Sequence, residues 1–227
     1  MTKENLLFAV IGLLFGMMIG FFFANSVNQG ALTPGATAIQ QQQGMPSGHP
    51  SVPGSGGSVA EVQAAIDRAK ADPNDFDAQM KAAELYYQIQ RFDGAIEFLK
   101  NANNLQPENY EVIVNLGNAN FDAGKYEEAE KWYTTALAKK PDNLDVRTDL
   151  GLSFVFREKP DNDRAISEFK KVLDANPTHV QALQNMAVVY TKKKDAVKAE
   201  EALAKLEKAD PSNATIAKLR EDIAALK

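Results

Sequence analysis

Cysteine is absent from this chain of 227 residues. Its absence excludes disulfides, thiol catalysis, lipoprotein anchoring through cysteine and thiolate metal sites. Positive charge is also scarce: 25 Lys and Arg residues stand against 30 Asp and Glu residues, and the basic cluster is limited to residues 192–194. Nucleic-acid binding needs concentrated Lys and Arg, so we expect no nucleic-acid partner.

Groups that could form a catalytic site are missing as well. The sequence pairs no nucleophile with a base, and no phosphate-binding glycine loop follows a strand. His49 has no other ligand type nearby, and His179 stands where a helix cap or a contact between repeats explains it. Asp161 and Asp163 resemble part of a calcium loop but lack its other oxygen ligands. We therefore expect no enzyme, no cofactor and no metal.

One long apolar run occupies residues 6–24 and contains only apolar residues and glycine. At about 1.5 Å per residue it spans about 28 Å, close to the roughly 30 Å hydrocarbon core of a bilayer. We predict a single transmembrane helix that acts as a signal anchor, with a cleaved signal peptide as the alternative. Gly12, Gly16 and Gly20 share one face, which favours a homodimer, although glycine is also common in membrane helices.

The residues around this run suggest an orientation. Lys3 lies in the tail of residues 1–5, and no basic residue follows the run before Arg68. The positive-inside rule then places the amino terminus in the cytoplasm and the rest of this single-pass protein outside it, in the periplasm if it is bacterial. Residues 25–57 carry no charge and are rich in Gly, Pro, Ser and Gln, so we predict a disordered linker.

The remainder of the chain repeats a pattern of about 34 residues. Within one period, residues 110–123 and 126–138 keep the apolar spacing of two helices, and Gly124 allows a turn between them. A proline then stops the second helix. Prolines recur at spacings of 34, 34, 36 and 34 residues, which is the strongest signal in the sequence. They are Pro73, Pro107, Pro141, Pro177 and Pro211.

Small residues recur in phase with the prolines. Gly117, Ala129, Tyr133 and Pro141 stand at the spacing of the tetratricopeptide pattern, and residues 150–177 repeat it. The chain therefore resembles the tetratricopeptide repeat family. The resemblance implies an all-α fold: a right-handed α-solenoid of helical hairpins, preceded here by the transmembrane helix and the linker. We expect a leading helix at 58–72, repeats at 76–109, 110–143, 144–179 and 180–211, and a capping helix at 212–227.

In this family the first helices of the repeats line a concave groove that binds extended peptides or partner helices. Acids outnumber lysines at the matching positions, which favours a neutral or basic segment, while Tyr87, Phe121, Leu152 and Val155 would supply apolar contact. The alternative is that these rings pack inside the solenoid. The resemblance implies the following groove residues: Asp77, Met80, Lys81, Glu84, Tyr87, Glu111, Val114, Asn115, Asn118, Phe121, Asp122, Asp145, Thr148, Asp149, Leu152, Val155, Gln181, Gln184, Asn185 and Val188.

One departure from the family pattern is Asn120, which replaces an aromatic residue and should find a hydrogen-bond partner or face the groove. The leading interpretation of function is a membrane-tethered scaffold that binds a peptide or partner helix and supports complex assembly. The first alternative is an assembly factor resembling the membrane-anchored tetratricopeptide proteins of cytochrome c maturation. The second is an architectural oligomer in the membrane without a peptide ligand.

Overall fold

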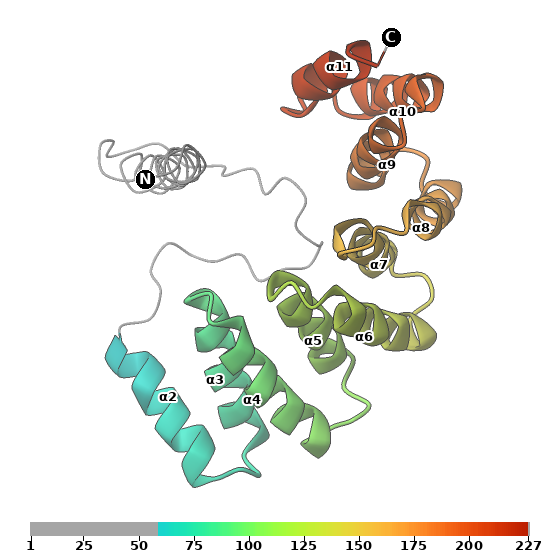
Figure 1. Ribbon diagram of the computed structural model, residues 1–227. Coiled ribbons are helices and arrows are strands. Elements are labelled where there is room, and N and C mark those ends of the chain that lie inside the picture. The colour runs from blue at the N-terminus through green and yellow to red at the C-terminus, as the bar shows by residue number, and fades with distance from the viewer. Residues whose placement is uncertain (1–58, 227) are drawn as a thin grey trace, which may run out of the picture. The chain divides into compact units, whose positions relative to one another are not determined.

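In the computed structural model, which describes residues 59–226, the chain forms helices joined by turns (Figure 1). Between these residues ten helices follow one another, and the predicted all-α stack of helical hairpins is confirmed. They are α2 (Val59–Ala71), α3 (Phe76–Gln88), α4 (Phe92–Leu105), α5 (Tyr110–Asp122), α6 (Tyr126–Lys139), α7 (Leu144–Phe156), α8 (Asn162–Ala175), α9 (Val180–Lys192), α10 (Ala196–Ala209) and α11 (Ile216–Ala224).

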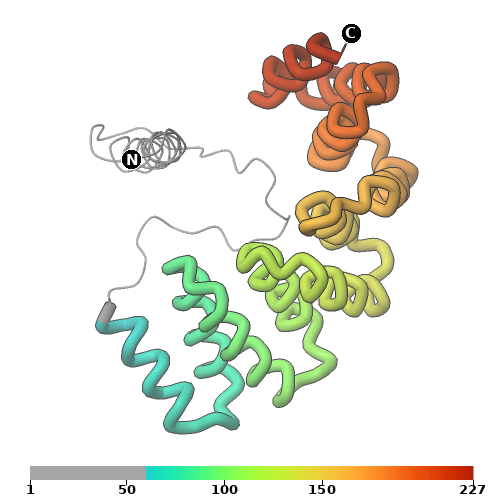
Figure 2. The backbone as a smooth tube through the Cα atoms, in the orientation of Figure 1, coloured from blue at the N-terminus to red at the C-terminus, as the bar shows by residue number. Residues whose placement is uncertain are grey.

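Four antiparallel pairs form the hairpins: α3 with α4, α5 with α6, α7 with α8, and α9 with α10. Within each hairpin the two helices pack most extensively against each other, and each packs next against the helix that precedes or follows the hairpin in chain order. Figure 2 traces the backbone through these successive hairpins. Helix α2 covers the first hairpin through Val62, Ile66 and Ala69, and α11 covers the last one through Leu219 and Ile223. The remaining faces of these two end helices are mostly exposed and polar, as a finite stack of repeats requires.

The prediction of a single-pass membrane protein must be corrected. No helix between residues 59 and 226 is long and apolar enough to cross a bilayer. The longest of these helices have 14 residues, which is about 21 Å against the roughly 30 Å hydrocarbon core of a membrane. The run at 6–24 on which the prediction rested, with Gly12, Gly16, Gly20 and the predicted linker at 25–57, lies outside the described residues.

The recurring prolines start the turns that join one hairpin to the next. In all five turns the residue two places after the proline donates its amide to the carbonyl just before the proline, at 3.1 to 3.3 Å. In four of them that donor residue is also the N-cap of a first helix, and its side chain accepts a hydrogen bond from the first turn. The caps are Asp75, Asn109, Asn143 and His179. The predicted cap role of His179 is thereby confirmed.

A left-handed residue closes the first helix in three of the four hairpins. Gly124 has a φ of 72°, and Gln90 and Lys194 hold the matching places with φ values of 58° and 57°. After Gly124, the amide of Lys125 donates to the carbonyl of Asn120 at 2.8 Å and so satisfies a carbonyl at the helix end. Glycine takes this conformation without cost, whereas the two longer side chains strain the backbone.

In two hairpins a glycine of the first helix faces an aromatic ring of the second. A Cβ at Gly117 would lie 2.5 Å from the ring of Tyr133, and one at Gly151 would lie 2.4 Å from the ring of Phe169. Both rings are completely buried. Each large ring on a second helix therefore fits because the residue opposite it on the first helix is a glycine. The other two hairpins carry the pairs Ala83 with Leu99 and Ala187 with Leu203 at these positions.

We expect Gly151→Ala to lower the free energy of unfolding by about 1 to 3 kcal/mol, because the added methyl overlaps the buried ring of Phe169. Urea unfolding followed by circular dichroism measures the loss. Adding Phe169→Leu should recover part of it, since the new pair matches the alanine and leucine of the outer hairpins. If the losses of the two single variants simply add in the double variant, the pairing is refuted.

Gln90→Gly and Lys194→Gly should each stabilise the protein by about 0.5 to 1 kcal/mol, because glycine relieves the left-handed strain at these exposed positions. Thermal unfolding measures the change. The matched reverse substitution is Gly124→Ala, which should destabilise by about 1 kcal/mol through the backbone alone, since no atom lies within 4 Å of the added methyl. Equal melting temperatures for all three variants would contradict this expectation.

Candidate functional site

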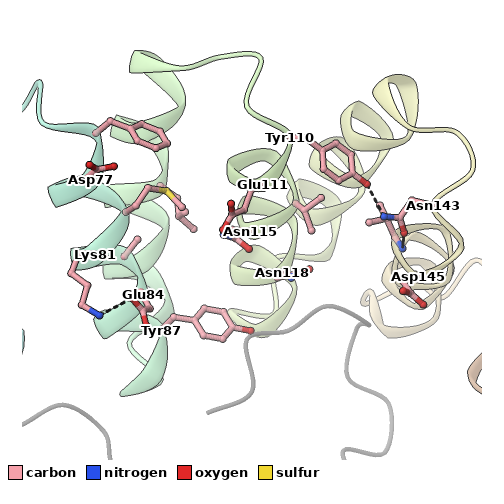
Figure 3. A pocket seen from close by; sticks show the side chains of 16 residues that line it. Asp77, Lys81, Glu84, Tyr87, Tyr110, Glu111, Asn115, Asn118, Asn143 and Asp145 are labelled. Atoms are coloured by element: carbon pink, nitrogen blue, oxygen red, sulfur yellow. Dashed lines mark hydrogen bonds and ion pairs between the residues drawn. The ribbon is translucent and has the colours of Figure 1, made fainter. Parts of the chain in front are cut away.

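A groove of about 800 Å³ opens between α3, α5 and the first turn of α7 (Figure 3). Its residues on α3 and α5 recur every three or four positions, so each helix presents one continuous face to the groove. Ten of the residues predicted from the sequence line it: Asp77, Met80, Lys81, Glu84, Tyr87, Glu111, Val114, Asn115, Asn118 and Asp145.

Carboxylates dominate the exposed rim of this groove. Asp77, Glu84, Glu111 and Asp145 all line it and are exposed to solvent, against the single lysine Lys81. The Nζ of Lys81 lies 2.8 Å from a carboxylate oxygen of Glu84, so the lysine is already paired within the rim. The rim therefore carries net negative charge and presents hydrogen-bond acceptors toward a ligand.

The wall beneath the rim is apolar and half-buried. Phe76 and Met80 come from α3, and Tyr110 and Val114 come from α5. The hydroxyl of Tyr110 accepts a hydrogen bond of 2.9 Å from the side-chain amide of Asn143, which holds the ring at the junction of two hairpins (Figure 3). Exposed charge above half-buried apolar surface suits a peptide that carries both charged and apolar side chains.

The sequence analysis missed six residues of this groove. Phe76 and Tyr110 could have been found, because each is an aromatic first residue of a first helix, directly followed by an acid at the same place in the repeat. The others belong to a helix cap, to a second helix or to the buried side of a first helix, and no sequence pattern singles them out. The six are Phe76, Ala83, Leu99, Tyr110, Asn143 and Val146.

Asn118 has a distinctive environment at this groove. The side chain is 1% exposed, and its Oδ1 accepts a 3.0 Å hydrogen bond from the hydroxyl of Tyr133. Its Nδ2 has no hydrogen-bond partner among the described residues. A buried donor in this state costs about 1 to 3 kcal/mol. The amide is therefore a donor that a ligand entering the groove can satisfy.

Tyr87 supplies a second polar group to the groove, and its hydroxyl donates to the carboxylate of Asp122. Burial and the hydrogen bond to Asp122 raise the pKa of the Tyr87 hydroxyl well above its usual range. The hydroxyl therefore stays protonated and neutral at physiological pH. Asn120 lies nearby in the sequence but is buried away from the groove, where its Nδ2 donates to the carbonyl of Leu116 at 2.7 Å. The predicted partner of Asn120 is thus confirmed.

Five predicted residues line neither this groove nor the second one described below. Phe121 is buried, with its ring 5.2 Å from that of Tyr126 and 5.8 Å from that of Phe156 between centroids. The alternative that rings pack inside the solenoid therefore holds for Phe121. Helix α7 is buried over most of its length because hairpins press on it from both sides. The five residues are Phe121, Asp122, Thr148, Asp149 and Gln181.

The other five predicted residues line a second, smaller groove of about 240 Å³ between α7, α9 and α11. Helix α11 contributes Lys218, Leu219 and Asp222 to it, and the N-cap Thr215 of that helix lines it as well; the sequence analysis assigned none of the four to a site. The surface predicted as one groove is therefore divided into two. The predicted residues in the second groove are Leu152, Val155, Gln184, Asn185 and Val188.

Two family profiles match the chain. One, described as the middle TPR-like domain of cilia and flagella-associated protein 70, matches residues 108–226, which is more than half of the chain. The other is the tetratricopeptide repeat itself and matches residues 57–104. The photosystem I assembly protein Ycf3 of Prochlorococcus marinus (strain NATL2A) is 31% identical over 71 residues, covering 31% of this chain and 41% of that protein. The chain spans less than half of the length of such curated relatives.

Solved structures show the same architecture. MamA is 26% identical with a TM-score of 0.55, and the match covers 72% of this chain and 89% of that one. YrrB, a tetratricopeptide repeat protein described as having an unusual peptide-binding site, is 21% identical with a TM-score of 0.62 over 72% and 86% of the two chains. The profiles, the relatives and the stacked hairpins agree, and the chain belongs to the tetratricopeptide repeat family.

Proposed function

We propose that this protein-interaction scaffold binds an extended neutral or basic peptide, or a partner helix, in the groove of α3, α5 and α7. The groove is assigned to repeats at 76–109 and 110–143 together with the start of the repeat at 144–179. The carrying observation is the buried amide of Asn118, a residue that lines the groove and whose Nδ2 has no hydrogen-bond partner among residues 59–226. A backbone carbonyl of a bound peptide would accept a hydrogen bond from this amide and so offset the cost of burying the amide unpaired.

The charge of the rim supports a basic rather than an acidic peptide. Four exposed carboxylates, opposed by one lysine that is already paired, attract Lys or Arg side chains and repel acids. This charge affects the association rate and the choice of partner more than the total affinity. The apolar wall of Phe76, Met80, Tyr110 and Val114 would provide most of the binding energy. At about 800 Å³ the groove is large enough for several side chains of a peptide.

A second candidate function is that of an assembly factor, which holds a segment of an incomplete complex and then releases it. The likeness to the photosystem I assembly protein Ycf3 favours it, although that likeness covers 41% of Ycf3. The two functions differ in the lifetime of the complex. A scaffold stays with its partner in the finished complex, whereas an assembly factor leaves; pulse-chase labelling followed by affinity capture of the full chain separates them.

We expect the triple variant Glu84→Gln, Glu111→Gln and Asp145→Asn to bind a fluorescent peptide of alternating Lys and Leu about tenfold more weakly at low salt. The difference should shrink at high ionic strength because salt screens exposed charges. Fluorescence anisotropy of the peptide with the full chain measures it.

The matched control removes the same charge from exposed positions outside both grooves, with Glu97→Gln, Glu127→Gln and Asp174→Asn. This control should bind the peptide nearly as tightly as the unaltered protein, because its substitutions lie away from the groove. An equal loss in both triple variants would show that net charge alone acts, and would remove the support for the rim.

The second test concerns the donor of Asn118. Asn118→Leu combined with Tyr133→Phe removes both members of one buried hydrogen bond, so stability should change little. The double variant should bind the same peptide about fivefold or more weakly, since the donor to the peptide backbone is lost. Tyr133→Phe alone is the control: it removes the hydroxyl that holds Asn118 but keeps the amide donor, so it should bind the peptide more tightly than the double variant does. Full affinity in the double variant, at an unchanged melting temperature, would refute the role of Asn118.

A further inference from the structure

The second groove, between α7, α9 and α11, has an apolar wall that is mostly buried and reaches the surface at Phe156 and at the half-buried Val188. Leu152, Val155 and Phe156 come from the carboxyl-terminal half of α7, Val188 from α9 and Leu219 from α11. Phe156 is 43% exposed, which makes it one of the few large apolar side chains that the described residues present to solvent. Its ring packs against those of Phe121 and Tyr126, at 5.8 and 6.0 Å between centroids, so it is held in place with part of its surface open to solvent.

Two lysines and one carboxylate line the second groove, and its other polar residues can both donate and accept hydrogen bonds. The Nζ of Lys192 lies 5.5 Å from the centroid of the Phe156 ring, and Lys192 forms no ion pair with any residue of the described range 59–226. Lys218 is already paired with two acids of its own helix, Glu221 at 3.2 Å and Asp222 at 2.9 Å. Of the two lysines in this groove, Lys192 is therefore the one that is available to pair with an acidic group of a ligand.

A buried donor supplies the second, independent observation. Asn185 lines the groove, its side chain is 5% exposed, and its Nδ2 has no hydrogen-bond partner within the described part of the chain. As at Asn118, burial of an unmatched amide is costly, and an acceptor on a ligand would remove the cost. Asp222 is the one carboxylate that lines this groove, in contrast to the four at the rim of the first.

We propose that the second groove binds an acidic and apolar peptide segment of a partner protein. A Leu or Phe side chain of the segment packs on the exposed Phe156 and the half-buried Val188, and a neighbouring Asp or Glu meets Lys192. A backbone carbonyl of the segment accepts from Asn185. A volume of about 240 Å³ suits one or two side chains, so the segment is short.

The two grooves lie at opposite ends of α7, because Asp145 and Val146 of its first turn line the first groove and Val155 and Phe156 of its last turn line the second. Opposite rim charge gives the two grooves different ligands. The scaffold would then hold a basic segment and an acidic segment at the same time. This inference stands on the second groove alone and does not require the proposed function of the first.

The test uses the full chain and two labelled peptides of equal length, one of alternating Glu and Leu and one of alternating Lys and Leu. We expect the acidic peptide to bind, and Lys192→Glu to weaken it about tenfold. The matched control is Lys194→Glu, an identical charge reversal two residues away that lies outside the groove. Asn185→Leu should weaken the acidic peptide about fivefold without lowering the melting temperature, because it removes a buried unmatched donor.

Competition measures whether the sites are separate. Saturation with the basic peptide should leave the acidic peptide bound. The triple variant Glu84→Gln, Glu111→Gln and Asp145→Asn should bind the acidic peptide as tightly as the unaltered protein does. The proposal is overturned if the acidic peptide fails to bind, if Lys192→Glu and Lys194→Glu act equally, or if the basic peptide displaces it. Failure of the basic peptide alone would overturn the proposed function of the first groove and leave this inference standing.

Discussion

The ring of Tyr133 packs on the bare backbone of α5 at Gly117, and this contact holds α5 and α6 close enough for their hairpin to form part of the stack. The same side chain extends to the candidate site, because its hydroxyl donates to Oδ1 of Asn118. Hairpin packing and the orientation of a groove residue thus depend on one fully buried tyrosine. Any change that moves this ring alters the position of the amide that a peptide would meet.

Burial, rather than surface charge, accounts for most of the stability of the stack. The ion pairs Lys125–Asp93 and Lys193–Asp163 join successive hairpins, but their groups are largely exposed and such pairs contribute little. Glu130 is an exception in degree: burial raises the pKa of its carboxyl, but hydrogen bonds from Arg157 and Arg164 together lower it by more, so that the net pKa lies below its usual range. The hairpins otherwise depend on their neighbours, since none can bury its apolar faces alone.

Much of the fold could be predicted because its signals are local. A proline turn and an Asp, Asn or His cap lie within four residues of one another, so the sequence marks the start of each first helix. The period of 34 residues then places equivalent positions on one face, and the groove residues of α3 and α5 follow from that register. An apolar run such as 6–24 is a different kind of signal, since its composition suits more than one environment.

The sequence by itself determined the helices, their pairing into hairpins and the face that each first helix presents. Only the tertiary structure decided which members of that face remain open to a ligand. Phe121 and Thr148 hold groove positions in the repeat yet are buried, and the capping helix α11 adds Lys218 and Leu219 to a second groove. The physical reason is that periodicity depends on neighbours three or four residues apart, whereas burial depends on helices that pack from distant parts of the chain.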